Sequence, residues 1–303
     1  MSGRHKRSHV LYKAYTPYIL SVPSMVVIFV VLLIPMCYAI YLSFTNASLL
    51  SIASGRYNMV GLENYTDFFV SGSYKKVFNA TFSYVIINTI IVCSVGLGTA
   101  LILNMKLKVN SIYRAVLILP WIIPQVVLAI IWRWMLNPKH GIINLTLEGM
   151  GIIDAGFSWF SNASWAMVTV IIVTLWKEYP LACLIFLAGL KSIPSDLYEA
   201  ASIDGAGAFK RFWHITLPGL RHVTEVLVML LTIWHFTNFT IIWLLTKGGP
   251  SDQTATMSIF TYLSAFTFNQ LGYGSAIGVI SLLITLVFAI VYYVIVIRKR
   301  ELE

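Results

Sequence analysis

The sequence predicts an all-α polytopic membrane protein with six transmembrane helices. Hydrophobic residues make up 58% of the 303 residues and charged residues only 11%, whereas about a quarter of the residues in a soluble domain are charged. Four long stretches contain no Asp, Glu, Lys or Arg: residues 14–55, 77–105, 226–246 and 253–297. Because an uncharged apolar run of about 18 or more residues can span a bilayer, these stretches indicate membrane-spanning segments.

Six candidate helices follow from this pattern. They lie at about 17–43, 80–104, 112–136, 165–189, 223–246 and 274–297, and each can cross a hydrocarbon layer of about 30 Å. Strands are excluded because the runs lack the alternation of a barrel, and an open sheet cannot satisfy its backbone in lipid. The first segment is too long for a signal-peptide core, so we expect an uncleaved anchor. The expected organisation is a cytoplasmic N-terminal segment, 1–16, followed by one transmembrane domain, 17–303.

The basic residues predict the orientation of the chain. With the N-terminus in the cytoplasm, fourteen of the 21 Lys and Arg residues fall in inner segments and five in outer segments. Since cytoplasmic loops carry the excess of basic residues, both termini are expected in the cytoplasm. The inner residues are Arg4, Lys6, Arg7, Lys13, Lys106, Lys108, Arg114, Lys191, Lys210, Arg211, Arg221, Arg298, Lys299 and Arg300. The outer residues are Arg56, Lys75, Lys76, Lys139 and Lys247.

Several other classes of function are excluded. A net charge of +9 suggests nucleic acid in a soluble protein, but here the basic excess follows the topology, and no nucleic-acid partner is expected. Cys37, Cys93 and Cys183 lack the spacing of a disulfide framework or a zinc site, and the six histidines lack ligand spacing, so no metal is expected. The chain has no G-x4-G-K-[ST] loop, no H-E-x-x-H and no G-x-S-x-G motif. It is therefore not expected to bind ATP by a P-loop or to be an enzyme.

The longest cytoplasmic connection, about 190–222, has more residues than two neighbouring helices require. Pro194 and Ser195 are suited to begin a short helix, and Gly205 and Gly207 are suited to end it. Gly205 is expected to have a positive φ or to lie at a close approach. Because a helix in the lipid interface has a similar pattern, this feature alone is not specific.

The spacing within this connection is more specific. Glu199-Ala200-Ala201, three residues, Gly205, nine residues, Ile215, one residue and Leu217-Pro218 form an EAA-x3-G-x9-I-x-L-P pattern. The pattern resembles the EAA loop of binding-protein-dependent ABC importer permeases, which lies in a cytoplasmic loop before the penultimate helix. The flanking Ile193-Pro194, Ile203-Asp204-Gly205-Ala206 and Gly248-Gly249-Pro250 are similar to the carbohydrate branch of that family, which takes up maltose, oligosaccharides and glycerol phosphates. The resemblance covers most of the chain.

This resemblance implies one subunit of a type I ABC importer. In the family the EAA loop forms a coupling helix that docks on a separate ATPase, which assigns coupling to Glu199, Ala200, Ala201, Asp204, Gly205, Ile215, Leu217 and Pro218. The implied partners are a second homologous permease, two ATP-binding cassette ATPase subunits, an extracytoplasmic solute-binding protein and the lipid bilayer. ATP and Mg are bound by the ATPase subunits, and no cofactor is expected in this chain. The implied location is the bacterial cytoplasmic (inner) membrane.

Polar and aromatic residues near the middle of the fourth and fifth spans are candidates for the substrate path. A charge at mid-bilayer costs at least about 2.5–3.5 kcal/mol on insertion scales and should face protein or water. Lys177 and Glu178 are adjacent, hence about 100° apart on a helix, and are not expected to pair with each other. Aromatic faces and hydrogen-bonding groups together bind sugars, although packing against the second permease or interhelical ion pairing is the alternative. The candidates are Trp176, Lys177, Glu178, Tyr179, Trp234, His235 and Asn238.

Two further features are less specific. Pro120, Pro124 and Pro180 remove backbone hydrogen bonds, and broken helices near the midplane are a common setting for transporter sites. The apolar pattern from Met257 to Phe266 predicts either a short helix on the outer surface or an interfacial segment before the sixth span.

Two other classes of function are alternatives to the importer. An ion-coupled secondary carrier would use Lys177, Glu178 and Glu225 as coupling groups, but the EAA pattern and the small number of spans argue against it. A membrane scaffold or enzyme has no supporting feature. Within the family we expect a sugar or oligosaccharide as substrate. A polyol, a glycerol phosphodiester or an acidic oligosaccharide stays open, because the binding protein determines most of the specificity.

Overall fold

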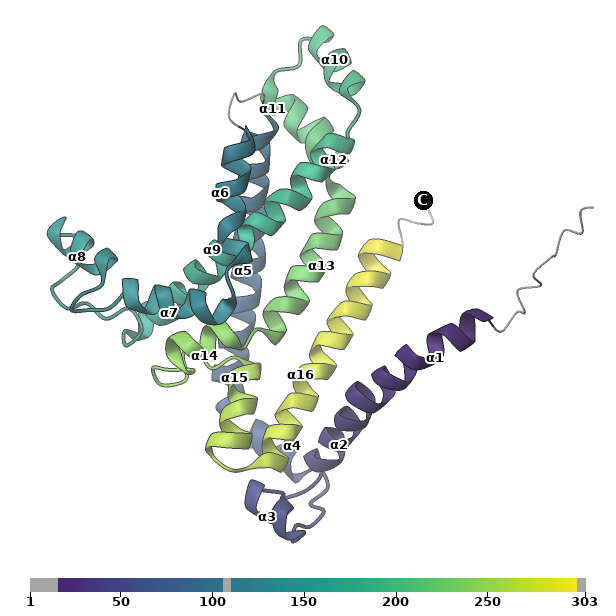
Figure 1. Cartoon of the computed structure of the whole chain (residues 1–303), viewed down its shortest axis with the longest axis vertical. Coiled ribbons are helices and arrows are strands. Elements are labelled where there is room, and N and C mark those ends of the chain that lie inside the picture. Colours follow the sequence, from purple (N-terminus) through teal and green to yellow (C-terminus); the bar gives the residue numbers. More distant parts are fainter. Residues whose placement is uncertain (1–15, 106–109, 299–303) are drawn as a thin grey trace, which may run out of the picture.

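The structure is a computed structural model in which residues 16–105 and 110–298 are described. Over these ranges the chain is helical, apart from loops and one isolated bridge between Thr45 and Met59, so the all-α prediction is confirmed. Figure 1 shows the arrangement of the helices. Their bounds are α1 Thr16–Ile28, η1 Phe29–Leu33, α2 Ile34–Ser43, α3 Leu49–Ser54, α4 Glu63–Val70, α5 Ser73–Asn104, α6 Asn110–Ile122, α7 Gln125–Met135, α8 Ile142–Gly149, α9 Ala163–Ser192, α10 Ser195–Ile203, α11 Ala208–Arg211, η2 Phe212–Thr216, α12 Leu217–Gly219, α13 Arg221–Thr237, α14 Thr240–Thr246, α15 Met257–Tyr262, η3 Leu263–Thr267, α16 Leu271–Tyr292 and η4 Tyr293–Arg298.

Four long apolar helices correspond to four of the expected spans. The first runs through α1, η1 and α2 from Tyr18 to Ser43, the second is α5, the fourth is α9, and the sixth runs from Leu271 to Val296. Each has 26 to 32 residues, which is long enough to cross the hydrocarbon layer. Residues 1–15 of the expected N-terminal segment lie outside the described residues, as do Lys106, Lys108, Lys299 and Arg300.

The third span differs from the continuous helix expected over 112–136. α6 ends at Ile122, and α7 begins at Gln125 and runs at 100° to it. Pro124 lies at the break. Its ring removes a backbone N–H group and disfavours the helical conformation of the residue before it. Pro180, in contrast, lies inside the unbroken α9.

The segment expected as the fifth span, 223–246, is divided as well. α13 ends at Thr237, where Asn238 takes an extended conformation, and α14 follows as a separate helix. At its other end α13 meets the segment Ala208–Gly219 at a bend of 63°. α14 packs against α7, and in Figure 1 both lie across the direction of the long helices. Apolar composition therefore identified both segments but not their bends.

The centre of the bundle consists of α5, α9 and α13, which pack against one another. The apolar part of α9 is 61% buried inside the chain, whereas that of the first and sixth spans is 6% buried. Tyr84, Val170 and Phe236 belong to one buried cluster, and Phe186 and Leu227 to a second. Apolar surface on the first and sixth spans suits contact with lipid or with another membrane subunit, because hydrocarbon does not oppose its exposure.

The apolar pattern before the sixth span forms α15 and η3, which pack into the bundle. Met257 and Ile259 are buried, and the backbone N–H of Met257 donates to Thr81 Oγ1 of α5 at 2.9 Å. A helix is therefore present, but it is buried in the bundle and does not lie on the surface as one of the two expected alternatives had it. It packs against α5 and α16 at their ends away from α10.

Candidate functional site

Lys177 of α9 binds the end of α6 at the break in the third span. Its ammonium group donates to the carbonyl oxygens of Ile123 at 2.6 Å, of Pro120 at 3.4 Å, and of Trp121. The last carbonyls of a helix have no backbone partners and carry the negative end of the helix dipole, so a cation there is favoured. Lys177 thus compensates for the break that Pro124 imposes.

A cavity of about 430 Å³ lies against this break. Its wall combines aromatic rings, amides and hydroxyls with one carboxyl group, and no basic residue is among the lining residues that the structure describes. The lining residues are Trp121, Gln125, Glu178, Trp234, Thr237, Asn238, Phe239 and Thr240. They come from α6, α7, α9, α13, the α13–α14 connection and α14. Such a wall can stack against a flat apolar face of a ligand and exchange hydrogen bonds with it.

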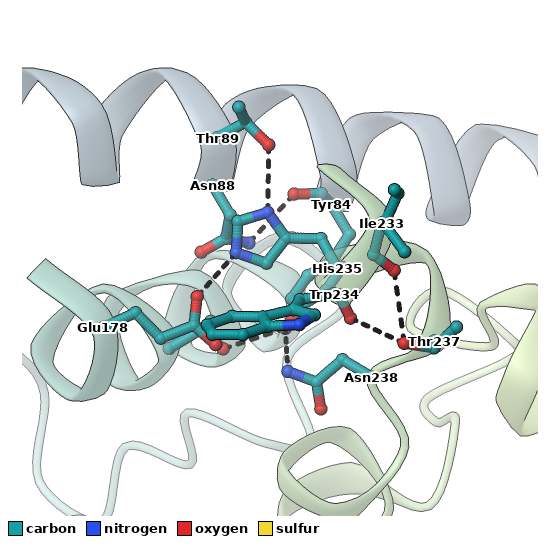
Figure 2. Close-up of polar contacts among 10 residues, drawn as sticks. Tyr84, Asn88, Thr89, Glu178, Ile233, Trp234, His235, Thr237 and Asn238 are labelled. Atoms are coloured by element: carbon teal, nitrogen blue, oxygen red, sulfur yellow. Dashed lines mark hydrogen bonds and ion pairs between the residues drawn. The ribbon is translucent and has the colours of Figure 1, made fainter. Parts of the chain in front are cut away.

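A buried polar network joins the three central helices beside the cavity. His235 Nε2 of α13 lies 2.8 Å from Glu178 Oε2 of α9, and His235 Nδ1 lies 2.9 Å from Thr89 Oγ1 of α5. Figure 2 shows the imidazole between these two partners. Because a carboxylate only accepts, Nε2 carries the proton and donates to Glu178. The expectation that Lys177 and Glu178 do not pair agrees with these contacts.

A second set of contacts runs parallel to the first. Asn238 Nδ2 donates to Tyr84 OH at 2.8 Å, and Tyr84 OH lies 3.0 Å from Thr174 Oγ1. The rings of Tyr84 and His235 meet edge-to-face with centroids 5.8 Å apart, so the two sets are in contact. The Oδ1 atoms of Asn238 and Asn88 are buried without a hydrogen-bond partner among the described residues. A buried acceptor without a partner costs free energy. Each of these two amide oxygens can therefore accept a hydrogen bond from an additional donor.

The seven substrate-path candidates have different surroundings in the structure. Glu178, Trp234 and Asn238 line the cavity. Trp176 packs edge-to-face on Trp132 with ring centroids 5.8 Å apart, and both partly buried rings pack against the buried cluster that contains Tyr84. These two tryptophans therefore differ: Trp234 is open to a ligand, and Trp176 is part of the packing.

The remaining candidates, Lys177, His235 and Tyr179, are not among the lining residues. Lys177 binds backbone carbonyl oxygens at the end of α6, and His235 donates a hydrogen bond to Glu178. Tyr179 is half-buried. Sequence reasoning missed Tyr84, Thr89, Thr174, Trp121 and Gln125. Two patterns could have indicated four of these residues: polar residues in the otherwise apolar second span for Tyr84 and Thr89, and positions beside the two prolines of the third span for Trp121 and Gln125.

The EAA residues lie on an exposed helix at one end of the bundle. Pro194 precedes α10, which runs from Ser195 to Ile203 as the pattern predicted, and none of its residues is buried. Figure 1 shows α10 at the end opposite α3 and α4. Glu199 and Ala200 are exposed, and Ala201 is half-buried. The helix therefore presents its surface outward instead of packing on its own bundle.

Gly205 ends α10 in a Schellman motif. Its φ is +72°, and a Cβ built on it would meet nothing within 4 Å, so the positive φ and not a close approach explains the glycine. The N–H of Gly205 donates to Ser202 O at 3.2 Å, and that of Ala206 to Ala201 O at 2.8 Å. These two bonds satisfy carbonyls that a helix end leaves open.

Side-chain contacts fix α10 against the following segment. Tyr198 OH lies 2.9 Å from Thr216 Oγ1, and Arg211 donates to Ser202 Oγ at 2.9 Å. The exposed apolar side chains include Ile203 (88% exposed) and Phe209 (75% exposed). The other EAA residues, Asp204, Ile215, Leu217 and Pro218, are exposed or half-buried along the same connection. An ordered helix with exposed apolar side chains is suited to bind another protein.

Comparison with known proteins identifies the family. A family model described as "Binding-protein-dependent transport system inner membrane component" matches residues 90–301, a range that contains both the cavity and α10. The chain belongs to this family. It is thus a multi-pass ABC transporter permease, and the resemblance carried by the EAA pattern is confirmed.

Several permeases are similar over nearly their whole length. A probable ABC transporter permease of Brucella suis biovar 1 is 34% identical over 294 residues, which cover 94% of this chain and 98% of the relative. The sulfoquinovosyl glycerol transport system permease of Agrobacterium fabrum is 32% identical, with 90% and 88% covered. The trehalose/maltose transport system permease of Thermococcus litoralis is 34% identical, with 91% of each chain covered.

Solved structures share the fold. A chain of a bacterial ABC transporter involved in import of the acidic polysaccharide alginate has a TM-score of 0.80 and 21% identity, with 94% of this chain and 96% of that chain covered. A chain of the alginate transporter in complex with an alginate pentasaccharide-bound periplasmic protein has a TM-score of 0.81, with 94% and 95% covered. The expected type I ABC importer fold is therefore confirmed.

Proposed function

We propose that this permease forms half of the translocation path of an ATP-driven, binding-protein-dependent importer for a sugar or oligosaccharide. The observation that carries the proposal is α10, an ordered helix that bears Glu199 and yet buries none of its residues. An exposed helix fixed by Tyr198 and Ser202 is suited to transmit movement from a partner, because it is rigid before the partner binds.

The partner at α10 is an ATPase subunit that binds ATP and Mg. Glu199 is exposed and available to pair with a basic residue of the ATPase, while Ala200 and Ala201 allow close approach. A complete importer holds two such ATPases and a second homologous permease. The exposed apolar faces of the first and sixth spans leave room for that permease and for lipid. The protein lies in the bacterial inner membrane, with both termini and α10 on the cytoplasmic side. This orientation agrees with the distribution of basic residues.

The substrate binds in the cavity beside the broken third span. Trp234 and Trp121 offer aromatic faces, and Glu178, Asn238 and Gln125 offer hydrogen-bonding groups, which is the combination that sugars require. The wall has a carboxyl group and, among the described lining residues, no basic group. This favours an uncharged sugar over an acidic oligosaccharide or a phosphodiester, because like charges repel. The names of the trehalose/maltose and sulfoquinovosyl glycerol permeases support a carbohydrate in general.

The test is substitution of Glu199 on α10 and of Gly205 at its end. Glu199→Lys is expected to abolish uptake by uncoupling or releasing the ATPase, since breaking a partly buried interface pair costs about 2–5 kcal/mol. Gly205→Asp is expected to do the same, because it places a charged side chain at the φ of +72° that ends the helix. Co-purification of the ATPase and sugar uptake into vesicles are measured together. Glu148→Lys, the same reversal on α8, is the control and should transport normally.

Two outcomes contradict the proposal. Normal uptake and normal ATPase co-purification in both α10 variants would remove the role of the helix. Uptake that needs the membrane potential but not ATP would instead favour an ion-coupled carrier.

A further inference from the structure

A second and larger cavity lies at the end of the molecule opposite α10. Its volume is about 730 Å³, and its wall is formed by α4, by the loop before α3 and by the segment from α15 to α16. Figure 1 shows these elements together at that end. In the proposed orientation this is the outer face of the membrane, where substrate arrives. None of the residues assigned to substrate or to coupling lines it.

The charge of this outer cavity is opposite to that of the chain. Glu63 and Asp67 are four residues apart, hence on one face of α4, and both line the cavity. No basic residue is among the lining residues that the structure describes, although the whole chain has a net charge of +9. Both carboxylates are exposed to solvent, so they are available to a positively charged group.

Long-range hydrogen bonds fix the walls of the outer cavity. Asn64 Nδ2 donates to the carbonyl oxygens of Ser43 and Thr45, each at 2.8 Å. The N–H of Gly272 donates to Ala47 O at 2.9 Å, and a Cβ on Gly272 would lie 1.9 Å from Thr45 O, so only glycine fits there. These contacts tie the first outer loop to the start of the sixth span. The cavity is therefore formed before any partner arrives.

Ser264 adds a buried hydroxyl group to the wall of the outer cavity. It lines the outer cavity and is only 1% exposed, and its Oγ has no hydrogen-bond partner among the described residues. Buried hydroxyl groups in proteins normally have a partner. Around it are Asn46, Asn269 and Gln270, whose amides also line the wall. An incoming polar segment finds donors and acceptors here in addition to the two carboxylates.

We propose that this outer cavity is the docking site for a basic side chain, carried on a protruding loop of the solute-binding protein. The inference rests on the proposed function, which supplies that partner. Charge complementarity selects the loop, because two carboxylates on a fixed wall attract a lysine or arginine and speed encounter. A bound divalent cation is the less suitable occupant, since no group of three or more His, Cys, Asp or Glu side chains is arranged for a metal within the described residues.

The experiment uses the complete importer in lipid nanodiscs. ATP hydrolysis is measured against the concentration of the purified solute-binding protein, loaded with its sugar. The double variant Glu63→Gln/Asp67→Asn is expected to raise the half-maximal concentration by on the order of tenfold and to leave basal hydrolysis unchanged. Because the attraction is electrostatic, added salt should weaken the wild type more than the variant. Asp154→Asn, at an exposed outer residue that does not line the cavity, should match the wild type.

Each outcome supports or overturns the proposal. The proposal is overturned if the double variant has the same half-maximal concentration of binding protein as the wild type. It is also overturned if Asp154→Asn raises that concentration as much as the double variant does. Stimulation that depends on added Ca²⁺, and not on the charge of the binding protein, also overturns it in favour of a cation site. If the wild-type importer is not stimulated by any binding protein, the proposed function fails instead, so the two failures are distinguishable.

Discussion

Helix α10 and the buried polar network are two polar regions of this permease that are built in opposite ways. α10 carries its motif within one continuous connection and buries none of its residues. The network joins His235 to Thr89, 146 positions away, and to Glu178, 57 positions away. α10 contributes little to the packing of its own chain, whereas the network forms only when α5, α9 and α13 have packed together.

This difference predicts how the two regions respond to substitution. Side chains without partners in their own chain can be changed without loss of folding, so variants on α10 should affect the ATPase and transport. Buried polar groups lose hydrogen bonds that water cannot replace, so variants in the network should affect the stability of the bundle.

Lys177→Met should have the largest effect on stability. It removes the cation from the carbonyls of Pro120, Trp121 and Ile123, and leaves them unsatisfied in a low-dielectric site. Since hydrogen bonds to charged groups contribute about 1.5–3 kcal/mol, we expect a loss of roughly 2–4 kcal/mol. Thermal unfolding of the purified protein in detergent measures it. Lys191→Met, at the exposed end of the same helix, should unfold like the wild type. Equal melting temperatures for both variants would show that Lys177 does not stabilise the break.

His235→Ala should be the next largest. The change leaves the buried Glu178 carboxyl group without its donor and is expected to cost about 2–3 kcal/mol. Glu178→Gln keeps an acceptor for His235 Nε2 and should cost less than about 1 kcal/mol. A double-mutant cycle of His235→Ala and Glu178→Ala, in which each single change removes the contact, should give a coupling energy of about 0.5–3 kcal/mol when followed by thermal unfolding. His222→Ala, at an exposed position of α13, is the control. A coupling energy near zero contradicts the network.

Gly205→Val should weaken the coupling of transport to the ATPase and leave the stability of the bundle unchanged. A β-branched side chain at φ +72° costs about 1–2 kcal/mol locally and disrupts the end of α10. Asn tolerates this conformation, so Gly205→Asn should retain more transport. Gly207→Ala, at a φ of −67°, should be neutral. Transport rate and melting temperature are measured on the same preparations. A melting temperature lowered as much as by Lys177→Met would erase the distinction between the two regions.

Trp234→Ala should have the smallest energetic effect, confined to the substrate. Removal of an exposed stacking ring from the cavity is expected to weaken transport affinity by about tenfold, or about 1.4 kcal/mol, without a change in melting temperature. Trp176→Ala, in which the ring packed on Trp132 is lost, should lower the melting temperature instead. The concentration dependence of uptake and thermal unfolding are the two measurements. Normal uptake by Trp234→Ala means that its ring lies outside the substrate path.

The helical fold, the approximate positions of the spans and the short helix α10 could all be predicted from the amino-acid sequence alone. Apolar runs report membrane crossing because the free energy of transfer sums along the chain. The EAA pattern and Gly205 could be recognised in the same way, because α10 follows a proline and ends in a local Schellman motif, and none of its residues is buried.

The roles of the mid-span residues could not be predicted from the sequence, because they depend on which helices pack together. Trp176, Lys177 and Glu178 are neighbours in sequence, but one packs on Trp132, one binds the end of α6, and one lines the cavity with His235 behind it. The 100° bend at Pro124 that creates the site for Lys177 was also hidden, since proline shows where a helix can break but not by how much. These roles depend on which helices pack together, and that arrangement is a property of the whole bundle and not of any local stretch of sequence.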